Sequence, residues 1–117
     1  MATLTVNTID RLGTIADFAS LLVAAAGGGD AFPNDGATFL VVQNNDASSK
    51  TVTVAFLSTV TVDGQVPPNK QFTVSAGKTL IVGPWPQNFY SDTNGNVDLT
   101  YSAVTNVKVG AFNLTTQ

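Results

Sequence analysis

Apolar residues recur at every second position along most of the chain from Ala37 onward. In residues 51–56, Val52, Val54 and Phe56 fall on one face of an extended chain, and two threonines and an alanine fall on the other. Three further runs repeat this alternation: residues 59–62, 71–74 and 97–101. β-Branched and aromatic residues fill these runs, as they do on pleated, half-buried surfaces. The pattern predicts β-strands and leaves little room for helix in this part of the chain.

Three other apolar runs do not alternate in this way. Residues 39–42 and 80–82 are continuously apolar, which predicts strands that are covered on both faces. The run 106–114 changes its parity near Gly110, and a β-bulge there would explain the change, because glycine tolerates the backbone of a bulge.

Turn-forming residues separate these runs at short intervals. They are Asp35-Gly36, Asn44-Asn45-Asp46, Asp63-Gly64, Pro67-Pro68-Asn69, Ala76-Gly77 and Asn94-Gly95. Many short strands joined by such turns are typical of a sandwich or a barrel. A chain of 117 residues has room for one domain. We therefore expect residues 1–117 to form one all-β domain, either a sandwich or a barrel.

The N-terminal quarter is open to two interpretations. Residues 16–26 fit either a short amphipathic helix or an extended strand, and the all-β character of the rest favours the strand. Residues 1–8 are predicted to form an edge strand or an arm that reaches a neighbouring subunit. Leu4 and Val6 are the apolar side chains of this segment, and they are candidate interface residues.

The composition excludes several kinds of chemistry. The chain has no His, no Cys and no Glu, so zinc sites built from His or Cys, thiol nucleophiles, disulfides and His-based acid–base catalysis are excluded. Only 11% of the residues are charged, against roughly 25% in an average domain. With five basic residues and a net charge of −3, the chain lacks the basic patch that a nucleic-acid partner requires. A charge-poor outside suits a subunit that is covered in an assembly, although a Thr-rich monomer is the alternative.

Each motif that resembles a cofactor, metal or catalytic site lacks a required residue. Residues 76–79 (Ala-Gly-Lys-Thr) resemble the end of a phosphate-binding loop, but Phe72 stands where that motif needs glycine. Residues 92–98 resemble the start of a calcium loop, but Val97 and Ala103 occupy the positions of its glycine and glutamate. Asp30 and Asp35 are interpreted as turn formers. We therefore expect no enzyme activity, no catalytic residue, no cofactor and no metal.

The only Trp of the chain lies in a proline-flanked aromatic segment. Trp85, Phe89 and Tyr90 cluster within eight residues of Gly83. Such a loop either presents an interface or a sugar-stacking platform, or it closes one end of the sandwich core. The three aromatic residues are therefore further candidates for an interface.

The sequence carries no visible membrane or export signal. The first residues lack a basic region, and the longest apolar stretch, residues 21–26, is too short to span a membrane. We expect no membrane partner and synthesis in a cytoplasm.

The segment from Phe32 to Asn44 (Phe-Pro-Asn-Asp-Gly-Ala-Thr-Phe-Leu-Val-Val-Gln-Asn) resembles one found in capsid decoration, or cement, proteins of tailed bacteriophages. These are small proteins encoded near the major capsid protein. The resemblance continues in order to about Leu114, through residues 51–54, 62–64, 74–79, 83–86, 89–90, 95–102 and 107–112. Residues 18–26 are more apolar than the family pattern leads us to expect.

The resemblance implies a single-domain, all-β, antiparallel β-sandwich that is jelly-roll-like, has about eight short strands and acts as a homotrimer. It also implies a structural virion protein, made in the host cytoplasm, that binds the major capsid protein on the outside of an icosahedral head. No catalytic residues come with this family. The alternative is a tail or fibre module that binds a carbohydrate receptor through the loop from Trp85 to Tyr90.

Overall fold

Ten strands in two sheets make up the computed structural model, which describes residues 2–9, 18–57, 63–65 and 68–114. The strands are β1 (Ala2–Thr3), β2 (Val6–Ile9), β3 (Val23–Ala24), β4 (Asp30–Pro33), β5 (Thr38–Asn44), β6 (Lys50–Val54), β7 (Lys70–Val74), β8 (Thr79–Val82), β9 (Asn96–Tyr101) and β10 (Val107–Leu114). Two short helical turns, the 3₁₀ turn η1 (Phe18–Leu21) and α1 (Gln87–Tyr90), complete the described elements. The predicted all-β fold is confirmed, while the predicted run 59–62 lies outside the described residues.

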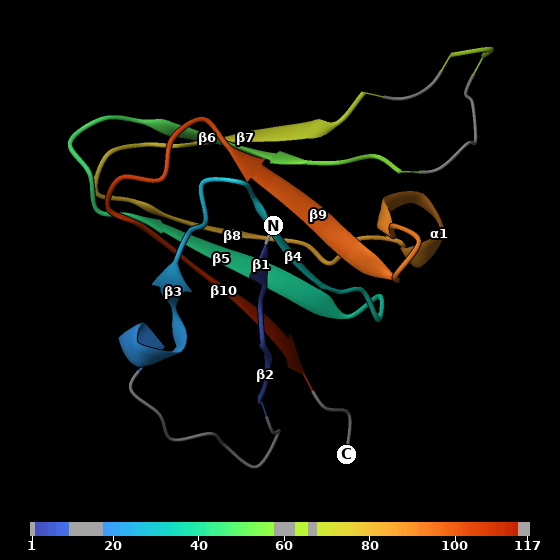
Figure 1. The fold of residues 1–117 in the computed structure, drawn as a ribbon, viewed down its shortest axis with the longest axis horizontal. Helices are drawn as coiled ribbons and strands as arrows, with labels where there is room; N and C mark the ends of the chain where they lie inside the picture. The colour runs from blue at the N-terminus through green and yellow to red at the C-terminus, as the bar shows by residue number, and fades with distance from the viewer. Residues whose placement is uncertain (1, 10–17, 58–62, 66–67, 115–117) are drawn as a thin grey trace.

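Eight of the strands pair in a nested order. β3 pairs with β10, β4 with β9, β5 with β8, and β6 with β7, all antiparallel. Two more antiparallel pairings, β5 with β10 and β6 with β9, join these pairs of strands into the sheets β3-β10-β5-β8 and β4-β9-β6-β7. Figure 1 shows these sheets as the two layers of the molecule. The predicted sandwich is confirmed, and its nested pairing is that of a jelly roll.

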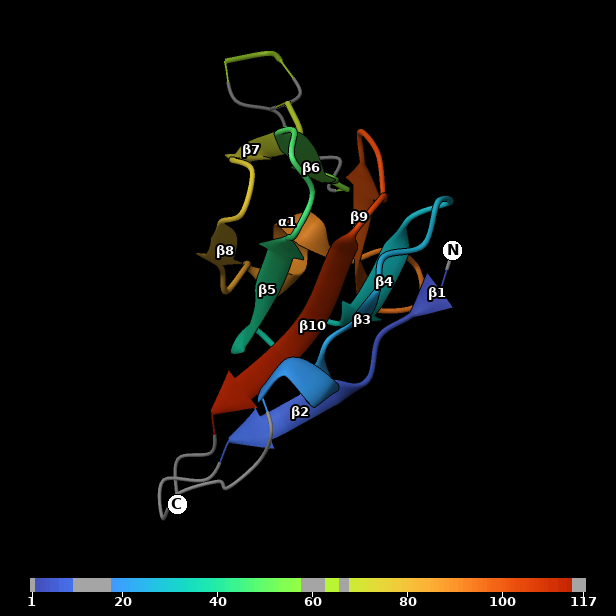
Figure 2. The same ribbon diagram turned by 90° about the vertical axis from the view of Figure 1, so that its left-hand side faces the viewer.

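The N-terminal segment adds one strand to an edge of each sheet. β1 runs parallel to β4, with Ala2 opposite Asp30, and β2 runs parallel to β10, with Val6 opposite Ala111. Figure 2 shows β1 beside β4 and β2 beside β10. Leu4 lies between the two strands and is buried in the core. We call residues 2–9 the N-terminal clip, because they join the two layers. These two parallel pairings depart from the predicted all-antiparallel arrangement.

The core lies between the two sheets and follows the predicted alternation. Val52, Val54 and Leu99 from one sheet meet Leu40 and Val42 from the other, and each has 0% exposure. Complete burial of such side chains is the main stabilising contribution to a domain of this size.

The predicted bulge at Gly110 is wrong. β10 pairs with β5 without interruption from Val107, opposite Asn44, to Asn113, opposite Thr38. The parity changes because β10 is buried on both faces at this point. A second cluster, with Leu22 and Phe112 among its buried members, covers the outer face of the sheet. A Cβ atom on Gly110 would lie 2.7 Å from Cδ2 of Leu22, so glycine is what allows Leu22 to pack this closely.

The described part of residues 16–26 contains both kinds of structure that the sequence allowed. Phe18–Leu21 form the 3₁₀ turn η1, and Val23–Ala24 form the strand β3. Residues 16 and 17 lie outside the described residues. The ring of Phe18 stacks on Phe112, with centroids 5.3 Å apart. The segment therefore covers the outer face of one sheet and then joins the edge of that same sheet.

Candidate functional site

The aromatic segment around α1 closes one end of the sandwich (Figure 1). Trp85 has 6% exposure, and its ring centroid lies 5.8 Å from that of Phe32 in the core. Phe56 packs against both Phe89, at 6.0 Å, and Tyr90, at 5.6 Å. Of the two interpretations of this loop, the structure favours the one in which its aromatic side chains close the end of the core.

The turn between β4 and β5 holds the α1 segment in place. Nε2 of Gln87 donates to the carbonyl of Asn34 at 2.9 Å, and Nδ2 of Asn34 donates to Oγ of Ser91 at 3.2 Å. Oδ1 of Asp35 accepts from the amide of Ala37 at 2.8 Å, and this bond is the main cause that lowers the pKa of Asp35. Asp35 is thus the turn former that the sequence predicts. The turn between β4 and β5 therefore holds the α1 segment against the sandwich.

The five interface candidates from the sequence belong to the protein's own core. Leu4, Trp85 and Tyr90 are buried, and Val6 and Phe89 are half-buried against the same core cluster. Leu4, Trp85 and Tyr90 therefore contribute to the core, while Val6 and Phe89 keep part of their surface accessible, and an interface role for the five residues stays a prediction.

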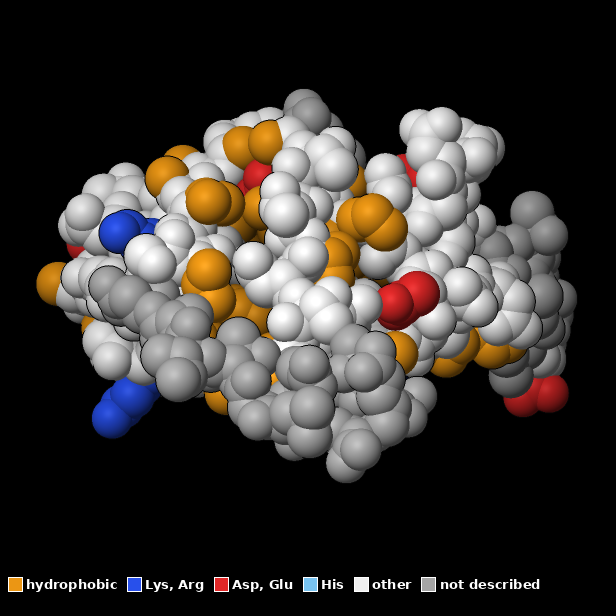
Figure 3. All heavy atoms as spheres, turned by 90° about the horizontal axis from the view of Figure 1, so that it is seen from below, with side chains coloured by type: hydrophobic (Ala, Val, Ile, Leu, Met, Phe, Trp, Pro, Cys, Tyr) orange, Lys and Arg blue, Asp and Glu red, His pale blue; other side chains and the backbone are white. Residues whose placement is uncertain are grey.

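Other large apolar side chains are exposed instead. They are Phe18 at 50%, Val23 at 51%, Leu57 at 38% and Ile81 at 67%. Ile81 overturns the expectation that the run 80–82 is covered on both faces, because its side of β8 is open. The run 39–42 does have apolar burial on both faces of β5. In Figure 3, hydrophobic side chains are spread among uncharged ones, with few charged groups between them.

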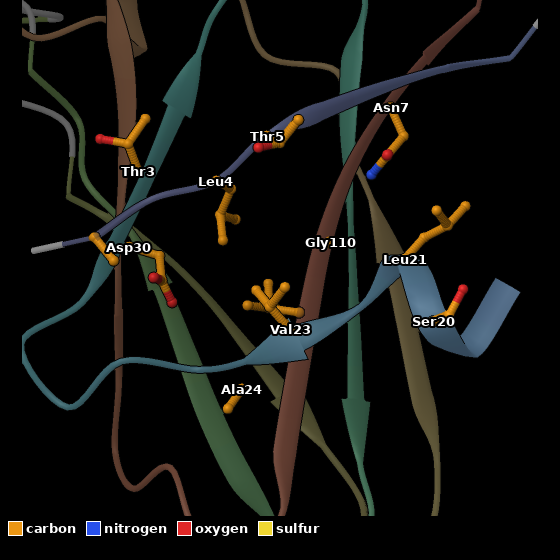
Figure 4. Close-up of a pocket in the computed structure, with 12 residues that line it drawn as sticks. Thr3, Leu4, Thr5, Asn7, Ser20, Leu21, Val23, Ala24, Asp30 and Gly110 are labelled. Atoms are coloured by element: carbon orange, nitrogen blue, oxygen red, sulfur yellow. The ribbon is translucent and has the colours of Figure 1, made fainter.

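A pocket of about 270 Å³ lies beside the N-terminal clip. In Figure 4, the clip forms one wall, η1 and β3 form the opposite wall, and β10 passes between them with Gly110 at the floor. We call this space the side pocket. Its lining residues include the polar Thr3, Thr5 and Ser20 and the aliphatic Leu4 and Val23. No local sequence pattern predicts this pocket, because it is formed by segments that meet only in the folded chain.

Asp30 lies in the wall of the side pocket and is 1% exposed. Its Oδ2 accepts a hydrogen bond from the hydroxyl of Tyr101 at 2.7 Å and one from the amide of Ala26 at 3.2 Å. Burial, together with the hydrogen bond to Asp30 and the charge of Asp30, raises the pKa of Tyr101 far above its usual range, so Tyr101 stays a neutral donor. Asp30 keeps a local side-chain hydrogen bond, to Ala26, as the turn-former interpretation expected, but it lies within β4 and also contacts β9.

The segment 92–98 forms a self-contained turn. Oδ1 of Asp92 accepts from the amides of Asn94, at 2.8 Å, and Asn96, at 3.0 Å, and the bond from Asn96 is the main cause that lowers the pKa of Asp92. Burial, and then the hydrogen bond and charge of Asp92, raise the pKa of Asp98 to about 6. Within the described ranges, no three acidic side chains gather in a way that could hold a metal ion.

Replacing Asp98 with asparagine is expected to stabilise the protein at pH 7 by about 1–2 kcal/mol and to leave it nearly unchanged at pH 4. Because the pKa of Asp98 is higher in the folded protein, Asp98 ionises more readily in the unfolded chain. The free energy of unfolding of the wild type therefore falls as the pH rises from about 3.8 to about 6. Solvent reduces the effect because Asp98 is half-buried. Urea unfolding at both pH values measures it, with Asp63→Asn in an exposed turn as the control. An equal effect of Asp98→Asn at the two pH values would contradict the expectation.

The chain matches no protein-family model, no curated protein sequence and no solved structure. Among the described helical turns, none has the length and apolar character to cross a membrane.

Proposed function

We propose that the protein is a structural virion protein that binds the outside of an icosahedral phage head, as a homotrimer, and stabilises contacts between major capsid subunits. The observation that carries the proposal is the apolar, charge-poor surface of the sandwich. Large apolar side chains are exposed on a chain with only 11% charged residues. Such a surface is poorly protected against association, and it becomes favourable when a partner covers it.

The fold and the ordered sequence resemblance support the same proposal. The resemblance implies a jelly-roll-like sandwich, and the strands pair in that nested order. A protein that binds only the assembled shell stabilises it by mass action. A trimer that contacts several capsid subunits at once raises its overall affinity without strong individual contacts. Few of those contacts would be ion pairs, so they would depend little on salt.

The carbohydrate-binding alternative loses its main support. A stacking platform for a sugar needs an exposed ring face, whereas Trp85 has 6% exposure and Tyr90 has 8%. No other observation in the described residues favours a glycan as the ligand of this loop.

The experiment that tests the proposal is binding to phage heads. The protein should co-purify with virions, give density above the capsid lattice in electron cryomicroscopy, and scatter light in solution as a trimer. Detection only at the tail, or absence from particles, would contradict the head-binding role. A stable monomer in solution that also binds heads as single copies would contradict the trimer.

Ile81→Ser is the sharpest variant for this proposal. Because Ile81 is 67% exposed, its replacement should leave the unfolding free energy within about 0.5 kcal/mol of the wild type. If partners cover this side chain, head binding in a sedimentation assay should fall by roughly tenfold or more. Thr100→Ser, an exposed change on the other sheet, is the matched control. Unchanged head binding by Ile81→Ser would remove β8 from the proposed contact surface.

A further inference from the structure

We propose that the side pocket binds a basic side chain, Lys or Arg, of a partner protein, with the carboxylate of Asp30 as its counter-ion. Carboxylates are rarely this deeply buried unless a positive charge accompanies them. Asp30 is 1% exposed, and the two groups that contact its Oδ2 are neutral donors. In the described part of the chain, the one ion pair joins Lys50 to Asp46, so no cation there balances Asp30.

The carboxylate of Asp30 has acceptor capacity beyond its two observed bonds. A carboxylate offers about four lone-pair sites, and Tyr101 and Ala26 use two of them through Oδ2. In Figure 4, the side chain of Asp30 extends from β4 toward the space between the clip and β3. A cationic donor that enters this space would form a charge-assisted hydrogen bond, which is roughly twice as strong as a neutral one.

The rest of the lining fits the stem of a long basic side chain. Leu4, Leu21 and Val23 line the pocket with aliphatic groups, against which the methylene groups of Lys or Arg can pack. Thr3, Thr5 and Ser20 are also among the residues that line this space. The volume of about 270 Å³ is just below the range of drug-sized ligand sites, so it suits one side chain better than a folded element.

The test uses the free protein and small probes, so its outcome does not depend on head binding. The probes are Nα-acetyl-lysine methylamide and its uncharged counterpart, Nα-acetyl-norleucine methylamide. Amide chemical shifts are followed during titration. We expect saturable shifts at Ala24, Ala26 and Gly110, with millimolar affinity for the lysine probe and at least roughly tenfold weaker binding of the norleucine probe. Gly77, in a turn outside the lining, is the reference amide.

Two variants separate the site from the fold. Asp30→Asn should weaken binding of the lysine probe by roughly tenfold or more. Because Asp30 also accepts from Tyr101 and Ala26, folding of this variant is checked by its amide spectrum. Val23→Trp fills the pocket from an exposed position and keeps Asp30, so it should abolish binding while the protein stays folded. Equal binding of both probes, shifts centred outside the pocket, or full binding by Val23→Trp would each overturn the proposal.

Discussion

Replacing Trp85 with alanine is expected to lower the unfolding free energy by about 3–5 kcal/mol. Trp85 is buried with 6% exposure and contacts Phe32, which has 0% exposure, at the closed end of the sandwich. Removing the indole leaves a cavity that the surrounding strands cannot fill, because β4 and β5 are held by their neighbours in both sheets. Domains of this size are stable by only about 5–15 kcal/mol, so the variant would be marginally folded.

Urea unfolding followed by circular dichroism measures this effect, since the variant loses the only Trp and with it the fluorescence signal. Trp85→Phe keeps an aromatic ring in the core and should cost clearly less. Ile81→Ala, at an exposed position, is the control and should stay within about 0.5 kcal/mol of the wild type. If Trp85→Ala lowers the unfolding free energy by less than about 1 kcal/mol, the segment around α1 does not close the core as its burial indicates.

Local sequence patterns predicted most of the strands but not the way they pair. Alternation in residues 51–56 identified Val52 and Val54 as core residues, and both are fully buried. The nested order depends on contacts between distant segments, such as β3 with β10. Periodicity reports only which face of a strand is apolar. For this reason the residues alone left a sandwich and a barrel equally open, and the jelly-roll expectation came from the resemblance.

The burial of three of the candidate contact residues could not be predicted for a related reason. An aromatic residue such as Trp85 in a proline-flanked loop has the same local pattern whether it fills a core or meets a partner. Gly110 was misread because burial on both faces of β10 changes the parity as a bulge would. The side pocket had no sequence signal, because Asp30 and Val23 face the same space only after β3 and β4 join different sheets.

Replacing Leu4 with alanine is expected to cost about 2–5 kcal/mol and to open the N-terminal clip before the rest of the domain. Leu4 is buried with 5% exposure between β1 and β2, and its amide donates to the carbonyl of Ala31 at 2.7 Å. The clip is held by its edge pairings with β4 and β10 and by the packing of Leu4 and Val6 against the core. Loss of the Leu4 side chain should therefore speed hydrogen exchange at the amides of Ala2 and Leu4.

Hydrogen exchange distinguishes local opening of the clip from global unfolding. In Leu4→Ala, exchange in the clip should accelerate by a larger factor than exchange in the central strands β5 and β9, whose amides open mainly with the whole domain. Thr5→Ala, an exposed change at the next residue, is the matched control and should leave both regions nearly unchanged. Equal acceleration in the clip and in β5 would mean that both belong to one cooperative unit. In that case the clip, which joins the two sheets, would be as essential to the fold as any strand of the jelly roll.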